Sequence, residues 1–136
     1  MEEFIASETS KIFGKGIKTY AKKYKVEEHD VSILLYMKKG DEVGYQTYVD
    51  GNFKEEVTIK DILGVKVMDL KGYSVIAPPY IYNFLVDFVN ELGTRSVDVT
   101  IFLNEDGDDV RFFLYKEGVL VREVFLKDLL GIKNEL

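Results

Sequence analysis

The chain of 136 residues contains no cysteine, a single histidine and two prolines. The absence of cysteine excludes disulfide bonds, thiolate catalysis and cysteine-ligated metals, and it suits a reducing compartment, so we expect a cytoplasmic protein. His29, in the turn EEHD, is a conceivable general base. No serine lies in a nucleophile-elbow pattern, however. We therefore expect a surface histidine and no catalytic residue, with an enzyme built around His29 as the remaining alternative.

Long apolar runs are also missing. The most apolar stretch, YSVIAPPYIYNFLVDFV, is interrupted by Pro78, Pro79, Asn83 and Asp87 and is too polar to span a bilayer. The first residues, MEEFIASETSKIFGKG, are acidic before they are basic and lack the apolar core of a secretory signal. There is one glutamine against many lysines and glutamates, a mixture reported for hyperthermophile proteins. We expect a protein that does not associate with membranes.

With 46% hydrophobic and 13% aromatic residues, the chain has the composition of a compact globule. Its length is typical of one domain, which we assign to residues 1–136. The net charge of −6 argues against nucleic-acid binding by the chain as a whole, but an average conceals local basic patches.

The most informative feature present is an internal repeat. YVDGNFKEEVTIKDILGVK, from Tyr48, aligns without a gap on YKEGVLVREVFLKDLLGIK, from Tyr115, with nine of nineteen positions identical. Unrelated segments would share about one identity at average residue usage. After one deletion upstream, Val31 and Ile33 align on Val99 and Ile101. The sequence thus predicts two copies of one supersecondary unit, at about residues 1–67 and 68–136.

Each copy reads as a helix, three strands and a short helical turn. The first helix is expected to begin at Thr9 or Ser10, because apolar residues follow at helical spacing: Phe13, Ile17, Tyr20 and Tyr24. The second runs from Pro78 to a left-handed cap at Gly93. The expected strands are residues 30–37, 42–49, 54–59, 97–103, 109–115 and 119–126, with one or two linking strands at 65–70 and 73–77.

Short connections containing glycine make these strands antiparallel. Asp50-Gly51 and Glu117-Gly118 occupy the second hairpin of each copy, where two-residue turns need positive φ. A lone αβββ unit leaves one sheet face uncovered, so the two copies are expected to share a core. The predicted fold is α+β, a tandem αβββ duplication with two main helices packed on antiparallel sheet, related by a pseudo-two-fold axis.

Apolar residues cover more than half of the second helix, so it should make contact on two sides. Either the first helix or the linker covers the additional surface, or this surface is a homodimer interface. The residues assigned to that interface are Tyr82, Val86 and Val89.

The first helix carries a lysine face, defined as Lys11, Lys15, Lys18, Lys22 and Lys25. These residues recur at steps of three and four, opposite the apolar residues, with no acid between them. One interpretation is a solvated outer face. The other is a docking surface for phosphate backbones, or for an acidic protein or lipid surface. Stacking platforms for single strands would come from Tyr36, Tyr45 or Phe113, which we expect to lie mostly in the core.

No motif predicts a metal or cofactor. The acidic loop NEDGDD, residues 104–109, lacks EF-hand spacing and is expected to be a hairpin turn. GKGIKT, from Gly14, lacks Walker spacing and lies inside a predicted helix. Asp61 and Asp128, in the repeated KD turn, are expected to cap a short helix.

The order strand, helix, three strands, repeated once, resembles the duplicated unit that builds one domain of a DNA sliding clamp. The stretch from Gly72 through the second helix to VDVTIFL carries this resemblance best. In that family the helices line the DNA and are basic. The first helix fits that pattern, whereas the second carries Asp87 and Glu91 and does not.

The sequence therefore predicts a non-enzymatic interaction or assembly protein, homodimeric through the second helix, with the lysine face as its docking surface. The alternative is a sequence-independent nucleic-acid-binding protein with clamp-like topology that uses the same lysines.

Overall fold

The computed structural model describes residues 2–40, 42–63, 78–103 and 110–125. The helical elements are α1 (Glu2–Tyr24), the 3-10 turn η1 (Glu28–Asp30), α2 (Ile59–Leu63) and α4 (Pro78–Leu92). The strands are β1 (Val31–Met37), β2 (Val43–Val49), β3 (Asn52–Val57), β4 (Val97–Leu103), β5 (Val110–Lys116) and β6 (Val119–Val124). The linking strands expected at 65–70 and 73–77, and the turn at 104–109, lie outside the described residues.

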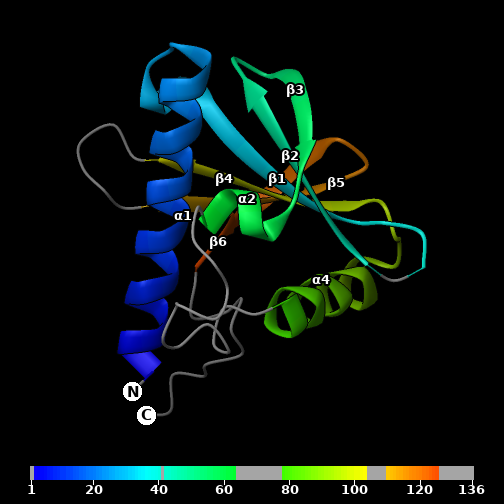
Figure 1. Cartoon of the computed structure of the whole chain (residues 1–136). Helices are drawn as coiled ribbons and strands as arrows, with labels where there is room; N and C mark the ends of the chain where they lie inside the picture. Colours follow the sequence, from blue (N-terminus) through cyan, green and yellow to red (C-terminus); the bar gives the residue numbers. More distant parts are fainter. Residues whose placement is uncertain (1, 41, 64–77, 104–109, 126–136) are drawn as a thin grey trace.

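The six strands form one antiparallel sheet in the order β3-β2-β1-β4-β5-β6. The first three strands and the last three therefore occupy separate halves, which meet where β1 pairs with β4 (Figure 1). The α+β class, the antiparallel sheet and the two main helices are confirmed.

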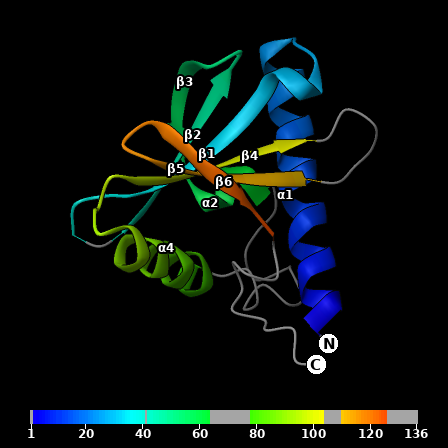
Figure 2. The ribbon, with the colours of Figure 1, turned by 180° about the vertical axis from the view of Figure 1, so that it is seen from behind.

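One face of this sheet carries the core. Alternate side chains of the strands are buried there, among them Ile33, Leu35, Val99, Ile101 and Leu114. The helix α1 contacts β1, β4 and β5, while α4 contacts β4, β1 and β2, so each helix reaches across the β1–β4 junction. Figure 2, viewed from behind, shows the strands in front, with no described helix over them.

The second hairpins of the two halves have the same geometry. Asp50 and Gly51 have φ of 51° and 80°, and Glu117 and Gly118 have φ of 51° and 82°. Both central residues have positive φ, as the two-residue turns of twisted hairpins require. A bulge follows in each half at the aligned position, between Thr47 and Tyr48 in β2 and between Leu114 and Tyr115 in β5.

The pairing of β1 with β2 and of β4 with β5 makes β1 and β4 equivalent in a register that differs by two residues from the sequence alignment. Val31 pairs with Val49, and Val97 pairs with Lys116, which is the sequence counterpart of Val49. By this pairing Val31 corresponds to Val97, whereas the alignment matched it to Val99. A shift of two residues keeps every side chain on the same face, so alternation alone does not reveal it.

The helix α1 begins at Glu2, so the prediction of an N-cap at Thr9 or Ser10 is wrong. No proline or glycine precedes Thr9 in the sequence, so no helix breaker stops the helix there. At the other end, Lys25 lies beyond the helix with φ of 59°. The amide of Val26 donates to the carbonyl of Ala21 at 3.0 Å, which closes a Schellman-type end.

The predicted limits of the second helix are confirmed. The helix α4 begins at Pro78 and ends at Leu92. Gly93 follows with φ of 70°, and its amide donates to the carbonyl of Val89 at 2.9 Å. This is the left-handed cap that glycine favours.

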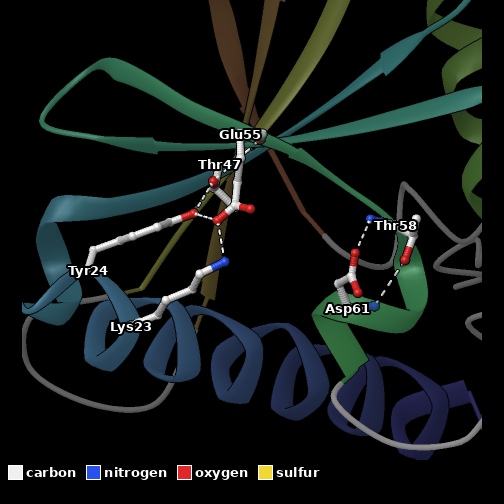
Figure 3. A network of polar contacts seen from close by, with 6 residues as sticks. All are labelled: Lys23, Tyr24, Thr47, Glu55, Thr58 and Asp61. Atoms are coloured by element: carbon white, nitrogen blue, oxygen red, sulfur yellow. Dashed lines mark hydrogen bonds and ion pairs between the residues drawn. The ribbon is translucent and has the colours of Figure 1, made fainter.

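The short helix α2 packs against α1 through a glycine. A Cβ added to Gly16 would lie 2.8 Å from the carbonyl oxygen of Ile62, so only glycine fits without movement. A reciprocal cap starts α2: the amide of Thr58 donates to Asp61 at 2.9 Å, and the amide of Asp61 donates to the Thr58 hydroxyl at 3.2 Å (Figure 3). The capping role predicted for Asp61 is confirmed, while Asp128 lies outside the described residues.

Candidate interaction surfaces

The lysine face points away from the sheet. Phe13, Ile17, Tyr20 and Ala21 of α1 are buried, whereas Lys15 and Lys22 on the other side are exposed. Lys18 is half-buried, and Lys25 is exposed but belongs to the left-handed end rather than to the helix. Lys11 lies within α1, and the surroundings of its side chain are outside the described part. The stripe is thus shorter than a continuous helical face would be.

The three residues of α4 that we assigned to a homodimer interface differ in their surroundings. Tyr82 is half-buried and lines a cavity, Val86 is half-buried, and Val89 is half-buried and packs against the core. Phe84, Leu85 and Phe88 are the buried members of α4. The linker, which together with the first helix was the alternative cover for this surface, lies outside the described residues, so homodimerisation through this side stays a prediction.

A cavity of about 590 Å³ lies between the ends of β2 and β3 and the first turns of α4. Tyr45, Val57, Ile59 and Tyr82 contribute its apolar wall, and Lys38, Glu42 and Glu56 are its charged members. These groups include no nucleophile next to a base, so the cavity provides no catalytic constellation.

The uncovered face of the sheet, which we name the open face, is rich in aromatic side chains. They come from both halves: Tyr36, Tyr48 and Phe53 from the first, and Phe102, Phe113 and Tyr115 from the second. Phe102 and Phe113 make an edge contact at 5.7 Å between ring centroids, and Tyr48 and Phe53 make one at 5.8 Å. Their bulk buries Ser32 and Thr100 between them, although no described helix covers this face.

Hydrogen bonds fix the aromatic side chains of the first half. The Tyr36 hydroxyl donates to Glu56 at 2.7 Å, and the amide of Gln46 donates to the same carboxylate at 3.1 Å. Tyr48 donates to Gln46 at 2.8 Å. Burial, followed by the bond to Glu56, raises the pKa of Tyr36 to about 12. Burial opposes ionisation of Glu56, but the bonds from Tyr36 and Gln46 and the nearby Lys38 hold its pKa below the usual range.

The second half of the open face uses an ion pair instead. Arg111 donates to both oxygens of Glu123, at 3.0 and 2.7 Å. The guanidinium also lies 5.2 Å from the ring centroid of Phe113. Glu123 is the sequence counterpart of Glu56, so each half holds one carboxylate here in a bound, ionised form.

Asp98 lies near the middle of the open face, opposite Tyr36 on one side and Tyr115 on the other. Burial raises the pKa of its carboxyl. Among the described residues no donor makes a hydrogen bond or ion pair with it, and its charge in turn contributes to the raised pKa of Tyr48. A half-buried carboxylate in this state is stabilised when a cation or hydrogen-bond donor reaches it.

On the core face, each half has an ion pair between its helix and its outer strand, and the acidic and basic partners are reversed between the halves. Lys23 of α1 bonds to Glu55 of β3 at 2.7 Å, and Tyr24 donates to the same carboxylate, as Figure 3 shows. At the aligned position of β6, Arg122 bonds to Glu91 of α4 at 2.8 and 3.1 Å. These partners lower the pKa values of Glu55 and Glu91.

The strongly exposed apolar side chains gather at one edge of the sheet. The described residues include five large ones of this kind, and four belong to β6 or directly follow it: Val119, Leu120, Val121 and Phe125. The fifth is Phe53 on β3. We name the first four the β6 edge patch.

Sequence reasoning placed Tyr36, Tyr45 and Phe113 mostly in the core. Tyr45 is buried there, but Tyr36 and Phe113 lie on the open face. Alternation along the strands could have predicted this, because Tyr36 and Tyr48 directly neighbour the buried residues Leu35 and Val49 and so lie on the opposite face. Asp98 gave no sequence signal.

No catalytic or metal site emerges from the described part of the chain. The side chain of His29 is half-exposed and lies 3.4 Å from Asp30, with no nucleophile in its contacts. No group of three or more potential metal ligands occurs within residues 2–40, 42–63, 78–103 and 110–125. Among the helices described there, none combines the length and apolarity that crossing a membrane requires.

Comparisons with known proteins give no relative: no family model, no curated protein and no solved structure matches the chain.

Proposed function

We propose that this chain is a non-enzymatic interaction protein that binds a protein partner on the open face of its sheet. The observation that carries the proposal is an aromatic surface on which Phe53 is exposed and five further rings are half-buried: Tyr36, Tyr48, Phe102, Phe113 and Tyr115. Hydrogen bonds hold Tyr36 and Tyr48, and the Arg111–Glu123 ion pair lies beside Phe113. Aromatic side chains with few rotatable bonds supply large contact area at low entropic cost, and they are enriched at protein interfaces.

A tandem duplication is part of the proposal, because it explains why the surface spans both halves. The aligned turns, the aligned bulges and the exchanged ion pairs support it. So does a backbone bond present twice at 2.9 Å, from Asp50 to Asp30 and from Glu117 to Ser96. The pseudo-two-fold axis would pass between Leu34 and Thr100, which are paired and occupy corresponding positions.

The charges of the open face favour a protein over a nucleic acid. The face carries Glu56, Asp98 and Glu123, and its Arg111 is already bound to Glu123. Proteins that bind single strands place aromatic side chains in a positively charged groove. Here the lysine face lies across the molecule from the aromatic side chains, so the two features do not form one groove.

Asp98, which makes no hydrogen bond or ion pair with a described residue, specifies the partner further. A segment that presents apolar or aromatic side chains together with an arginine or lysine would cover the rings and pair with this carboxylate. Removing the carboxylate while keeping its shape, as in Asp98→Asn, should therefore weaken such a partner without disturbing the fold.

Selection from displayed random peptides on the immobilised full chain tests the proposal. Enriched peptides should be aromatic or apolar with at least one basic residue. They should bind the double variant Tyr48→Ser, Phe53→Ser at least about tenfold more weakly than the wild type. Two aromatic contacts contribute more than about 1.4 kcal/mol to binding, which corresponds to a factor of ten. The matched control Lys15→Ser, Lys22→Ser should bind as the wild type does. Peptides that bind the first variant normally and lose affinity to the second would contradict the proposal.

The nucleic-acid alternative rests on Lys15, Lys22 and Lys25, which are exposed and form no ion pair with described residues. It predicts that labelled single- and double-stranded oligonucleotides bind with an affinity that falls steeply with salt. Lys15→Glu, Lys22→Glu should abolish that binding. An anisotropy titration at low salt that shows no binding would remove this alternative.

A further inference from the structure

The sheet formed by the described strands has two outer edges, and the side chains of one of them protect it against pairing with another strand. The strands β3 and β6 lie at opposite ends of the strand order, so each has one side that no described strand pairs with. Such an edge exposes unpaired backbone donors and acceptors, and natural proteins block it with charged residues, most often lysine. The two edges are a matched pair, because both follow the same turn and the same bulge.

The side chains of the two edges differ at the aligned positions. Where β3 carries Asn52 and Lys54, β6 carries Val119 and Val121. Thr58, which caps α2, aligns with Phe125. Val119, Leu120 and Phe125 are 68%, 53% and 66% exposed, and Val121 is 39% exposed. The edge of β3 therefore has a lysine at its bulge, and the edge of β6 has an apolar strip.

The charges that β6 does carry are neutralised within the chain. Arg122 is held by Glu91 on the core face, and Glu123 is held by Arg111 on the open face. A second strand approaching this edge would meet paired charges and apolar side chains. Like-charge repulsion, which would oppose pairing of β6 with itself, is thus reduced.

We infer that β6 pairs in antiparallel register with β6 of a second copy of this chain, forming a closed homodimer with one continuous sheet. The occupant is a second copy because one permissive edge and one blocked edge suit isologous closure. Two permissive edges would instead propagate into a fibre. A two-fold axis perpendicular to the sheet keeps the same face of both copies on one side. The open faces would then form one surface of double width.

The size of the contact sets the expected affinity. The β6 edge patch exposes on the order of 400 Å² of apolar surface per copy, typical of the largest patch on a monomer. Burying it in both copies gives about 800 Å², below the roughly 1,200 Å² of stable specific interfaces and in the range of weak, transient contacts. Backbone hydrogen bonds between the strands add directionality. We therefore expect a reversible dimer with a dissociation constant in the micromolar range.

Sedimentation equilibrium of the full chain across micromolar concentrations tests the inference. The wild type should be in monomer–dimer equilibrium. Val121→Lys, which places the β3 residue at the aligned bulge of β6, should weaken dimerisation by at least about tenfold, since it adds a repelling pair of charges. The matched control Lys54→Arg should dimerise like the wild type. Circular dichroism melting of each variant establishes that it is folded.

The reverse exchange provides a second, independent readout. Lys54→Val should open the β3 edge and produce species larger than a dimer, because two permissive edges propagate. A wild type that stays monomeric at high micromolar concentration would overturn the inference and indicate that the edge receives a foreign strand or none. A dimer that survives Val121→Lys and dissociates in Val86→Glu would also overturn it, in favour of the helix-two side.

This inference is separate from the proposed binding of a partner to the open face. A monomeric Val121→Lys that still binds the selected peptides would leave the open-face proposal intact. A dimer that binds no peptide would leave the edge pairing intact.

Discussion

The two halves of this molecule share strand and turn geometry and differ in their surfaces. Both have the turn with two positive φ values, the bulge after it, and an ion pair that connects the outer strand to a helix. The ion pair has its acid on the strand in the first half and on the helix in the second, and the outer edge carries Asn52 and Lys54 in one half and Val119 and Val121 in the other. The turn geometry and the alternation of buried side chains in the strands are common to both halves and define the fold. The surface side chains differ between the halves without changing it.

The most severe test of this equivalence is in the core. Leu35 and Ile101 are fully buried at corresponding positions on either side of the β1–β4 junction. Replacing either by alanine should cost about 2–5 kcal/mol, with similar losses in both halves, because each substitution leaves a cavity in the shared core. Urea denaturation measures both. Losses that differ by several kcal/mol would show that one half alone carries the stability.

A smaller effect is expected at the contact between α1 and α2. Gly16→Ala would place a Cβ 2.8 Å from the carbonyl oxygen of Ile62, so α1 and α2 must separate. The loss should be about 1–3 kcal/mol. Lys15→Ala, at an exposed position of the same helix, is the comparison variant. Equal behaviour of the two variants would contradict the close approach of α2.

Much of this architecture follows from local sequence. Pro78 and Gly93 mark the ends of α4 because proline fits a first helical turn and glycine fits a left-handed cap. Asp50-Gly51 and Glu117-Gly118 predict their turns for the same conformational reason.

The rest depends on tertiary contacts that local patterns do not encode. Thr9 has the chemistry of an N-cap, but the helix continues through it to Glu2. The alignment of Val31 with Val99 preserved alternation, so the two-residue shift to Val97 emerged only from strand pairing. Both faces of the central strands contain large apolar residues. Which face the helices cover, and hence the exposure of Tyr36 and Phe113, is decided by packing.

The ion pair of the first half differs from that of the second by an additional hydrogen bond from Tyr24. In the first half Tyr24 adds a hydrogen bond to the carboxylate that Lys23 holds, with Thr47 at 2.6 Å from the same hydroxyl. Tyr24→Phe should cost about 1 kcal/mol, the usual net contribution of one hydrogen bond. Glu91→Gln should cost less, because the Glu91 carboxylate is more exposed than that of Glu55. A thermal melt of each variant compares them.

The free energy of unfolding at acidic pH should depend on the carboxylates of Glu55 and Glu91. The pKa values of Glu55 and Glu91 are lowered in the folded chain, chiefly by Lys23 and by Arg122. Their stabilisation is therefore present at neutral pH and is lost as the pH falls through their folded pKa values. In the double variant Glu55→Gln, Glu91→Gln, stability should fall less steeply as the pH decreases. An unchanged pH dependence would indicate that solvent screens both pairs completely.

The smallest effect is expected at Asp98. Its pKa is raised by burial, so the folded state is favoured when the carboxyl is protonated, and this advantage is lost as the pH rises through the acid range. Asp98→Asn should therefore be slightly more stable than the wild type at neutral pH, and the difference should vanish in acid. A destabilised variant at neutral pH would mean that the carboxylate has a partner in the free protein.

Amide hydrogen exchange of the wild type at several protein concentrations tests the difference between the two edges most directly. The account predicts that exchange in residues 119–125 slows as concentration rises, while exchange in the matched segment 52–58 stays constant. Exchange that is independent of concentration in both segments would contradict the pairing of β6, and slowing in both alike would contradict the protection assigned to Lys54.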